Sequence, residues 1–161
     1  MIPENINDRI KSGRAYLIKD ANPDKGFEVF TTLMNNGGNG ICVSGIHPND
    51  IKRKYDLDKA SFIWLTQNQS AEKNHVHPSN ISRLFFILKN MLRENKSEII
   101  FLEGLEHLFA HNRYETVMSF LYALKDETII NKVRTLVLVD DFARTKKQMG
   151  FLEDEMEELI L

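Results

Sequence analysis

The sequence contains one cysteine among 161 residues, which excludes a disulfide framework within the chain. Chains without disulfides are typical of reducing compartments, so we expect a cytoplasmic protein. No apolar run approaches the roughly 20 residues that are needed to cross a bilayer. Residues 1–5, MIPEN, also lack the basic and then apolar profile of a signal peptide. These absences predict a protein without a membrane partner.

The chain also lacks an excess of positive charge. Its 21 lysines and arginines are outnumbered by 23 aspartates and glutamates, which leaves a net charge of −2. Domains dedicated to binding nucleic acid normally carry a basic face. The short basic cluster Lys52-Arg53-Lys54 is better explained as a solvated segment. We therefore expect no nucleic-acid partner.

What the sequence does contain is a regular alternation of strand-like and helix-like segments. The strand-like segments are continuously apolar, which is typical of a parallel sheet buried on both faces. We expect strands at 14–19, 40–45, 61–66, 98–102 and 134–141, and a polar surface loop at 67–77. We expect helices that start at Asn22-Pro23, Pro48 and Pro78, one over 105–124 broken near Asn112, and one from Lys146 to Ile160.

These elements predict a lead-in at residues 1–13 and a single α/β domain at residues 14–161. The domain is expected to have three layers, α/β/α, around a mostly parallel sheet of five strands. In such sheets, ligands bind beyond the carboxyl ends of the strands. The candidate functional residues are therefore those that follow the predicted strands.

Two of the predicted strands end in acidic residues. Glu103 and Glu106 follow the strand at 98–102, and Asp140 closes the strand at 134–141. Phosphate-processing ATPases place a carboxylate near Mg²⁺ in this way, because a rigid strand holds the oxygen ligands that the ion prefers. Acids are also common where a chain simply leaves the core, and this structural interpretation is favoured.

The phosphate-binding loop that such an ATPase needs is missing. That loop is rich in glycine and ends in Lys followed by Ser or Thr, between the first strand and its helix. Here residues 19–28 read KDANPDKGFE, so Lys25 precedes the glycine and Phe27 stands where a hydroxyl is required. Pro23 has no backbone N–H to offer a phosphate, and the acids of this stretch would repel a triphosphate. ATP hydrolysis is not expected.

Other chemistry has little support in the sequence. His107 and His111 have a spacing that can hold a metal ion, but no third ligand is evident and the arrangement is not that of a zinc protease. Ser44 lacks the nucleophile-elbow pattern, and Cys42 is expected in the core. We expect no catalytic residue, no metal and no cofactor. A ligand pocket, if one is retained at the strand ends, would involve Glu103, Glu106, His107, Asp140 and Trp64.

The order of these short motifs resembles an archaeal family of unknown function, DUF835. The motifs are GRAYLI at 13–18, GICVS at 40–44 before His47-Pro48, FIWLT at 62–66, Pro78, and FLEGLEHL at 101–108 before Asn112. The family is similar to RecA-type ATPases of the KaiC-like branch, so the resemblance implies a RecA-like topology without the phosphate loop. It also implies a regulatory or protein-interaction domain, found alone or attached to signalling modules. His107 departs from the aromatic residue that is usual at its position.

Three functions remain open from the sequence. The favoured one is a non-catalytic regulatory, signalling or protein-interaction domain with a protein partner, such as a second copy in a homodimer. The alternative is a degenerate ATPase-like domain that senses a nucleotide or small ligand, and the least favoured is an enzyme using Glu103 or Glu106 as acid or base. The predicted C-terminal helix has a basic start and an acidic end, which opposes its macrodipole. Its apolar stripe would pack either on its own sheet or on a partner: Met149, Leu152, Met156, Leu159 and Ile160.

Overall fold

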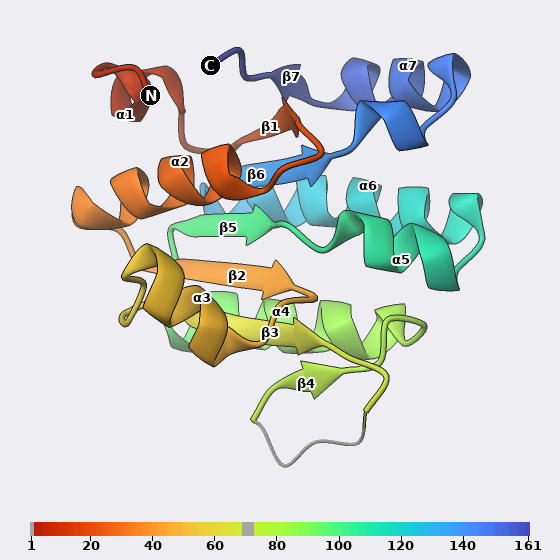
Figure 1. The fold of residues 1–161 in the computed structure, drawn as a ribbon, viewed down its shortest axis with the longest axis horizontal. Helices are drawn as coiled ribbons and strands as arrows, with labels where there is room; N and C mark the ends of the chain where they lie inside the picture. Colours follow the sequence, from red (N-terminus) through yellow and green to blue (C-terminus); the bar gives the residue numbers. More distant parts are fainter. Residues whose placement is uncertain (1, 69–72) are drawn as a thin grey trace.

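The computed structural model describes residues 2–68 and 73–161 and shows one parallel sheet between two layers of helices (Figure 1). The strands lie in the order β4-β3-β2-β5-β6-β1-β7, and all pairings are parallel. The strands are β1 Arg14–Lys19, β2 Gly40–Ser44, β3 Ser61–Leu65, β4 His75–Val76, β5 Ile99–Leu102, β6 Arg134–Val139 and β7 Glu157–Glu158.

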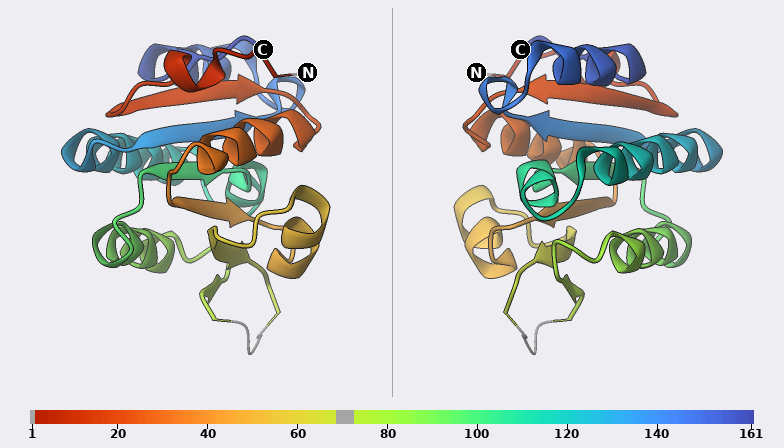
Figure 2. Two further views of the ribbon diagram at one scale, coloured as in Figure 1. Left: turned by 90° about the vertical axis from the view of Figure 1, so that its left-hand side faces the viewer. Right: turned by 90° about the vertical axis from the view of Figure 1, so that its right-hand side faces the viewer.

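The helices divide between the two faces of the sheet (Figure 2). They are α1 Ile6–Arg9, α2 Asp24–Asn35, α3 Pro48–Tyr55, α4 Ile81–Glu94, α5 Leu105–His111, α6 Tyr114–Asn131 and α7 Lys146–Glu155, with a 3-10 turn η1 at Asp141–Ala143. One apolar cluster joins the sheet to α1, α2 and α3, and a second joins it to α4, α5, α6 and α7. Neighbouring residues of β1 point to opposite clusters, since Tyr16 lies in the first and Leu17 in the second.

The predicted fold class is confirmed. The five predicted strands are present, and β1 and β2 are separated in the sheet by β6 and β5. Because all strands are parallel, the residues that follow β1, β2, β3, β5 and β6 meet at one edge of the sheet, where the arrows of Figure 1 point. The sheet has seven strands instead of five, because two short outer strands were not predicted.

The first unpredicted strand, β4, lies in the segment 67–77 that was expected to be a loop. His75 and Val76 pair with Trp64 and Leu65 of β3. Residues 69–72 of this segment lie outside the described residues. The following helix begins at Ile81 and not at Pro78, because the side chain of Asn80 accepts a hydrogen bond from the backbone N–H of Arg83 and caps the helix there.

The second unpredicted strand corrects the C-terminal helix. This helix ends at Glu155, and Met156 is extended, with φ −133° and ψ 145°. Residues Glu157 and Glu158 then pair with Tyr16 and Leu17 of β1. The predicted continuation to Ile160 is wrong because the free edge of β1 offers ladder hydrogen bonds, whereas a longer helix would gather more acids at its negative end.

The break that was predicted near Asn112 is present. Asn112 is extended between α5 and α6, and its side-chain amide donates to the carbonyl oxygens of Leu108 and Pro78, each at 2.9 Å. In the described part of the chain, none of the helices has both the length and the apolar character that crossing a bilayer demands.

Candidate functional site

Residues 20–23 connect β1 to α2, at the place where a phosphate-binding loop would lie. The Asp20 carboxylate accepts a hydrogen bond from the backbone N–H of Asn22, and the Asn22 side chain accepts one from the backbone N–H of Asp24, both at 2.9 Å. Pro23 has no N–H. The turn thus bonds two of its own backbone donors with its own side-chain oxygens, and these donors do not point to an external anion.

The first turn of α2 is also held from outside. The Tyr55 hydroxyl donates to the Asp24 carboxylate, and Lys54 forms an ion pair with it at 3.2 Å. The Tyr55 hydrogen bond and the Lys54 ammonium together lower the pKa of Asp24. Deeper in the helix, a Cβ atom added at Gly26 would lie 2.7 Å from the Phe101 ring, so α2 packs directly on β5. The Phe101 ring thus occupies the space between Gly26 and the sheet.

Three of the five candidate residues surround Gly45, just after β2. The Ser44 hydroxyl donates to the Glu103 carboxylate at 2.6 Å, and the Trp64 indole N–H donates to the carbonyl oxygen of Gly45 at 3.3 Å. The ring of His107 lies against Gly45, because a Cβ atom there would be 2.1 Å from its Nε2 atom. Glu103, His107 and Trp64 therefore meet around one turn.

The Glu103 side chain is largely buried, and burial raises the pKa of its carboxyl group. The Ser44 hydrogen bond, the charge of His107 and the Gly45 backbone N–H act in the opposite direction and limit the rise in pKa. Because folding favours the protonated form of this carboxyl group, the folded chain binds the proton more tightly than the unfolded chain does. Its stabilising contribution is complete below the unfolded pKa and is lost as pH rises through the folded pKa.

We therefore expect Glu103→Gln to stabilise the protein relative to wild type by about 1 kcal/mol near pH 7, with no difference near pH 4. Glutamine keeps an acceptor for Ser44 and removes the buried charge. Urea unfolding of both proteins from about pH 4 to pH 7 measures the effect. The exposed acid Glu94 provides a control, since Glu94→Gln should leave the pH profile unchanged. A gap for Glu103→Gln that widens toward low pH would contradict the expectation.

The other two candidate residues, Glu106 and Asp140, contact each other, and Glu106 also pairs with Arg144. Glu106 accepts a hydrogen bond from the backbone N–H of Asp140 at 3.3 Å and forms an ion pair with Arg144 at 3.1 Å. The Arg144 guanidinium lies 4.1 Å above the ring of Phe109. The Asp140 carboxylate accepts from the backbone N–H of Phe142 at 3.1 Å. Both acids are thus bonded within the chain.

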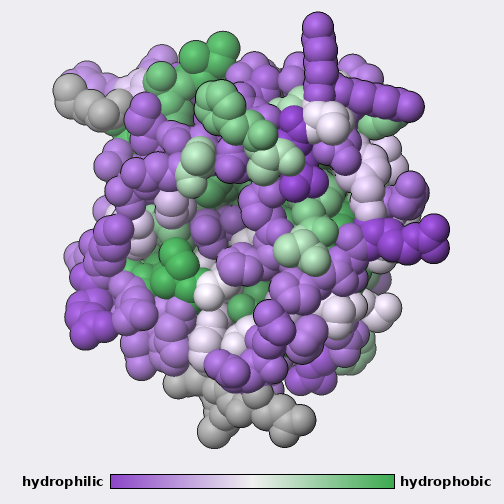
Figure 3. All heavy atoms as spheres, turned by 45° about the vertical axis from the view of Figure 1, so that its right-hand side comes forward, coloured by the Kyte–Doolittle hydropathy of each residue, from purple (hydrophilic) through white to green (hydrophobic). Residues whose placement is uncertain are grey.

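The residues that could hold a metal ion do not gather. The part of the chain that the structure describes contains no group of three or more His, Cys, Asp or Glu side chains suitable for one. The ring of His111 contacts the backbone carbonyl of His107 at 3.0 Å and lies edge-on to the ring of His77 at 5.8 Å. His111 and His77 are thus held by contacts with neighbouring groups of the domain. Figure 3 looks partly onto this end of the sheet, where hydrophilic and hydrophobic residues are interleaved.

Two residues of this region were missed as partners. On sequence grounds, Ser44 is weighed only as a nucleophile. Its position at the end of a buried strand, next to a glycine, was a signal that its hydroxyl could bond an acid at the end of a neighbouring strand. Arg144 had no signal, because its pairing with Glu106 depends on α5 and η1 meeting across the sheet edge.

The strand order and the closed β1–α2 turn define the class: a RecA-like α/β fold without a phosphate-binding loop. The structure is similar to the crystal structure of the KaiC-like protein PH0186 from the hyperthermophilic archaeon Pyrococcus horikoshii OT3, with a TM-score of 0.64 and 10% sequence identity. The similarity covers 83% of this chain and 65% of that chain. At this identity it shows a shared fold alone.

Within this class, the chain belongs to the DUF835 family, described as a protein of unknown function, whose sequence profile matches residues 19–156. A search of curated proteins found no match.

Proposed function

We propose that the chain is a cytoplasmic, non-catalytic domain for regulation or signalling through protein interaction. The observation that carries the proposal is the β1–α2 turn, in which the side chains of Asp20 and Asn22 bond two backbone donors at the place where a phosphate would bind. A domain of this fold that does not bind a nucleotide at this turn can still act by binding other proteins at its surface.

The strand-end acids also support this proposal. Glu103 is bonded to Ser44, and Glu106 to Arg144, so neither carboxylate is free to hold Mg²⁺ without breaking an existing contact. At the same end of the sheet, the Phe142 side chain is 93% exposed. Aromatic residues are enriched in the cores of protein interfaces, and the exposed Phe142 ring is available to a partner.

A second candidate function, the sensing of a small ligand, is favoured by a groove of about 690 Å³ between α2 and α3. The Thr31 hydroxyl lines this groove, is buried and has no hydrogen-bond partner among the described residues. Asp24, Glu28 and Asp56 line it with Lys54 as the cation, so the groove suits a small cationic ligand better than a nucleotide.

Calorimetric titration separates these functions. With Mg-ATP at millimolar concentration we expect neither heat of binding nor a rise in melting temperature, because side chains of the turn already bond two of its backbone donors and Pro23 has none. A dissociation constant below about 100 μM for Mg-ATP would overturn the non-catalytic interaction proposal. Binding of a simple diamine that is lost in Glu28→Gln, but kept in the exposed control Glu94→Gln, would instead support the second function.

A further inference from the structure

The outward face of α7 has features that the domain itself does not use. Met149, Leu152 and Met156 lie on the inner face of this segment and join the apolar cluster below it. At 100° per residue, the opposite side of the helix carries Lys147, Gly150, Phe151 and Asp154. The helix lies at the periphery of the molecule, next to β7 (Figures 1 and 2). This outward face is therefore accessible to another molecule.

The two central residues of this face are unusual for an exposed helix. Glycine is a poor helix former, yet Gly150 stands in the middle of α7, and a Cβ atom added there would meet nothing within 4 Å. Next to it, the Phe151 side chain is 43% exposed. No close packing against the residues that the structure describes explains the glycine. A small residue beside a large apolar one is what a second helix needs for close approach.

The two charged residues of this face, Lys147 and Asp154, also differ from their neighbours in their ion pairing. The other acids between 153 and 158 form ion pairs with cations of the same chain: Glu153 and Glu158 with Lys19, Glu155 with Lys125 and Glu157 with Arg14. Among the described residues, neither Asp154 nor Lys147 forms such a pair. Lys147 moreover lies in the first turn of α7, where the helix dipole disfavours a cation.

We propose that a second copy of this chain docks on this face, with the two α7 helices antiparallel about a two-fold axis between Gly150 and Phe151. Residues equally far from the axis then meet, so Lys147 faces Asp154 of the partner subunit. Phe151 likewise lies over Gly150 of the partner subunit. The face is self-complementary in charge and in shape, as a two-fold interface requires.

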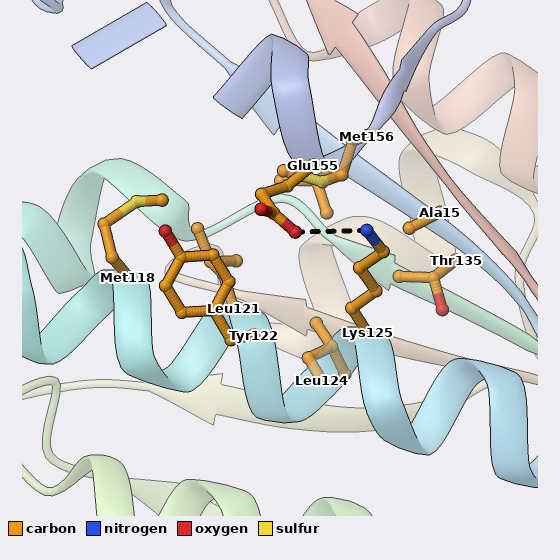
Figure 4. A pocket seen from close by; sticks show the side chains of 10 residues that line it. Ala15, Met118, Leu121, Tyr122, Leu124, Lys125, Thr135, Glu155 and Met156 are labelled. Carbon is orange, nitrogen blue, oxygen red and sulfur yellow. Dashed lines mark hydrogen bonds and ion pairs between the residues drawn. The ribbon is translucent and has the colours of Figure 1, made fainter. Parts of the chain in front are cut away.

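A small hollow lies between α6 and the C-terminal end of α7 (Figure 4). Its lining is mostly apolar and includes Met118 and Tyr122 of α6, and the Tyr122 side chain is 41% exposed. The Lys125–Glu155 ion pair lies at its rim. No residue that we place in the dimer contact lines this hollow, so the proposed contact rests on α7 alone. Because α7 has only ten residues, the contact is small, and we expect a weak dimer with a dissociation constant on the order of 100 μM.

Sedimentation equilibrium tests this dimer, and the inference deepens the proposed interaction function. The wild-type mass should rise with concentration from 18.7 kDa toward twice that value. Lys147→Glu and Asp154→Lys, made singly, should each raise the dissociation constant about tenfold, because each places like charges opposite each other. The double variant should return to within about threefold of wild type, because the pairs are only reversed.

Phe151→Ala and Gly150→Leu should also raise the dissociation constant, about tenfold or more, by removing the apolar contact and by blocking close approach. Phe86→Ala is the matched control, since Phe86 is another exposed phenylalanine, on α4. A thermal melt of each variant confirms that it is folded. A wild-type monomer at about 1 mM would overturn the dimer, as would unchanged affinity in the α7 variants or no rescue in the double variant. None of these outcomes changes the result of the Mg-ATP titration. The dimer can therefore be disproved while the proposed non-catalytic function stands, and the reverse also holds.

Discussion

Replacement of Phe101 by alanine is expected to lower the free energy of unfolding by about 3–5 kcal/mol. The Phe101 side chain is 0% exposed and lies in the centre of β5. Its ring meets Phe27 edge-on at 5.1 Å and Phe30 at 5.5 Å, both from α2. Removing the ring leaves a cavity between the sheet and α2 that rigid neighbours fill only in part. Urea unfolding followed by circular dichroism measures the loss.

Two further variants make this result specific. Phe142→Ala removes the same ring from a side chain that is 93% exposed, so it should change the free energy of unfolding by less than about 0.5 kcal/mol. Phe101→Leu keeps much of the buried volume and should fall between wild type and Phe101→Ala. A cost below about 1 kcal/mol for Phe101→Ala would mean that α2 does not rest on β5 as the structure shows.

Arg144→Ala is expected to cost about 2 kcal/mol, the second largest effect. Its guanidinium joins three parts of the fold, because it pairs with Glu106, lies over Phe109 and follows η1 just before α7. The Arg144 side chain is only 16% exposed, so solvent screens its ion pair less than it would screen a surface pair. Urea unfolding again gives the change in free energy.

A double-mutant cycle with Glu106→Gln separates the ion pair from the rest of the effect. We expect a coupling energy of about 1 kcal/mol between the two residues. Arg53→Ala is the control, because the Arg53–Asp50 pair is exposed at 78% and 59% and should contribute less than about 0.5 kcal/mol. If Glu106→Gln cost nothing and the coupling were zero, Glu106 would have no structural role, and its carboxylate would again be a candidate for chemistry.

The parts of the fold that local pattern determines were predictable. β1, β2, β5 and β6 are mostly continuous apolar runs, which are typical of strands buried on both faces of a sheet. β4 and β7 were not predictable, because their few residues form strands only through pairing with β3 and β1. For β7 that pairing joins Glu157 to Tyr16, which lie at opposite ends of the chain, and no local pattern carries this information.

The candidate site shows the same limit. The sequence placed Glu103, Glu106, His107, Asp140 and Trp64 at one edge of the sheet, because parallel strands end together. It did not show that they separate into two groups, one around Gly45 and one in which Glu106 joins Asp140 and Arg144. That separation depends on side-chain partners from other elements, above all the hydroxyl of Ser44 and the guanidinium of Arg144.

The two outermost strands of the sheet, β4 and β7, are only two residues long. An exposed strand edge of ordinary length is a template on which another chain can add a strand, and this is how aggregation through sheets begins. Here either edge offers little of that template, and the residues of β7 are two exposed glutamates that would repel a copy of themselves. Growth by strand addition is thereby discouraged at both ends. The dimer that we propose uses a helix surface instead, and a two-fold contact of that kind is closed and does not grow.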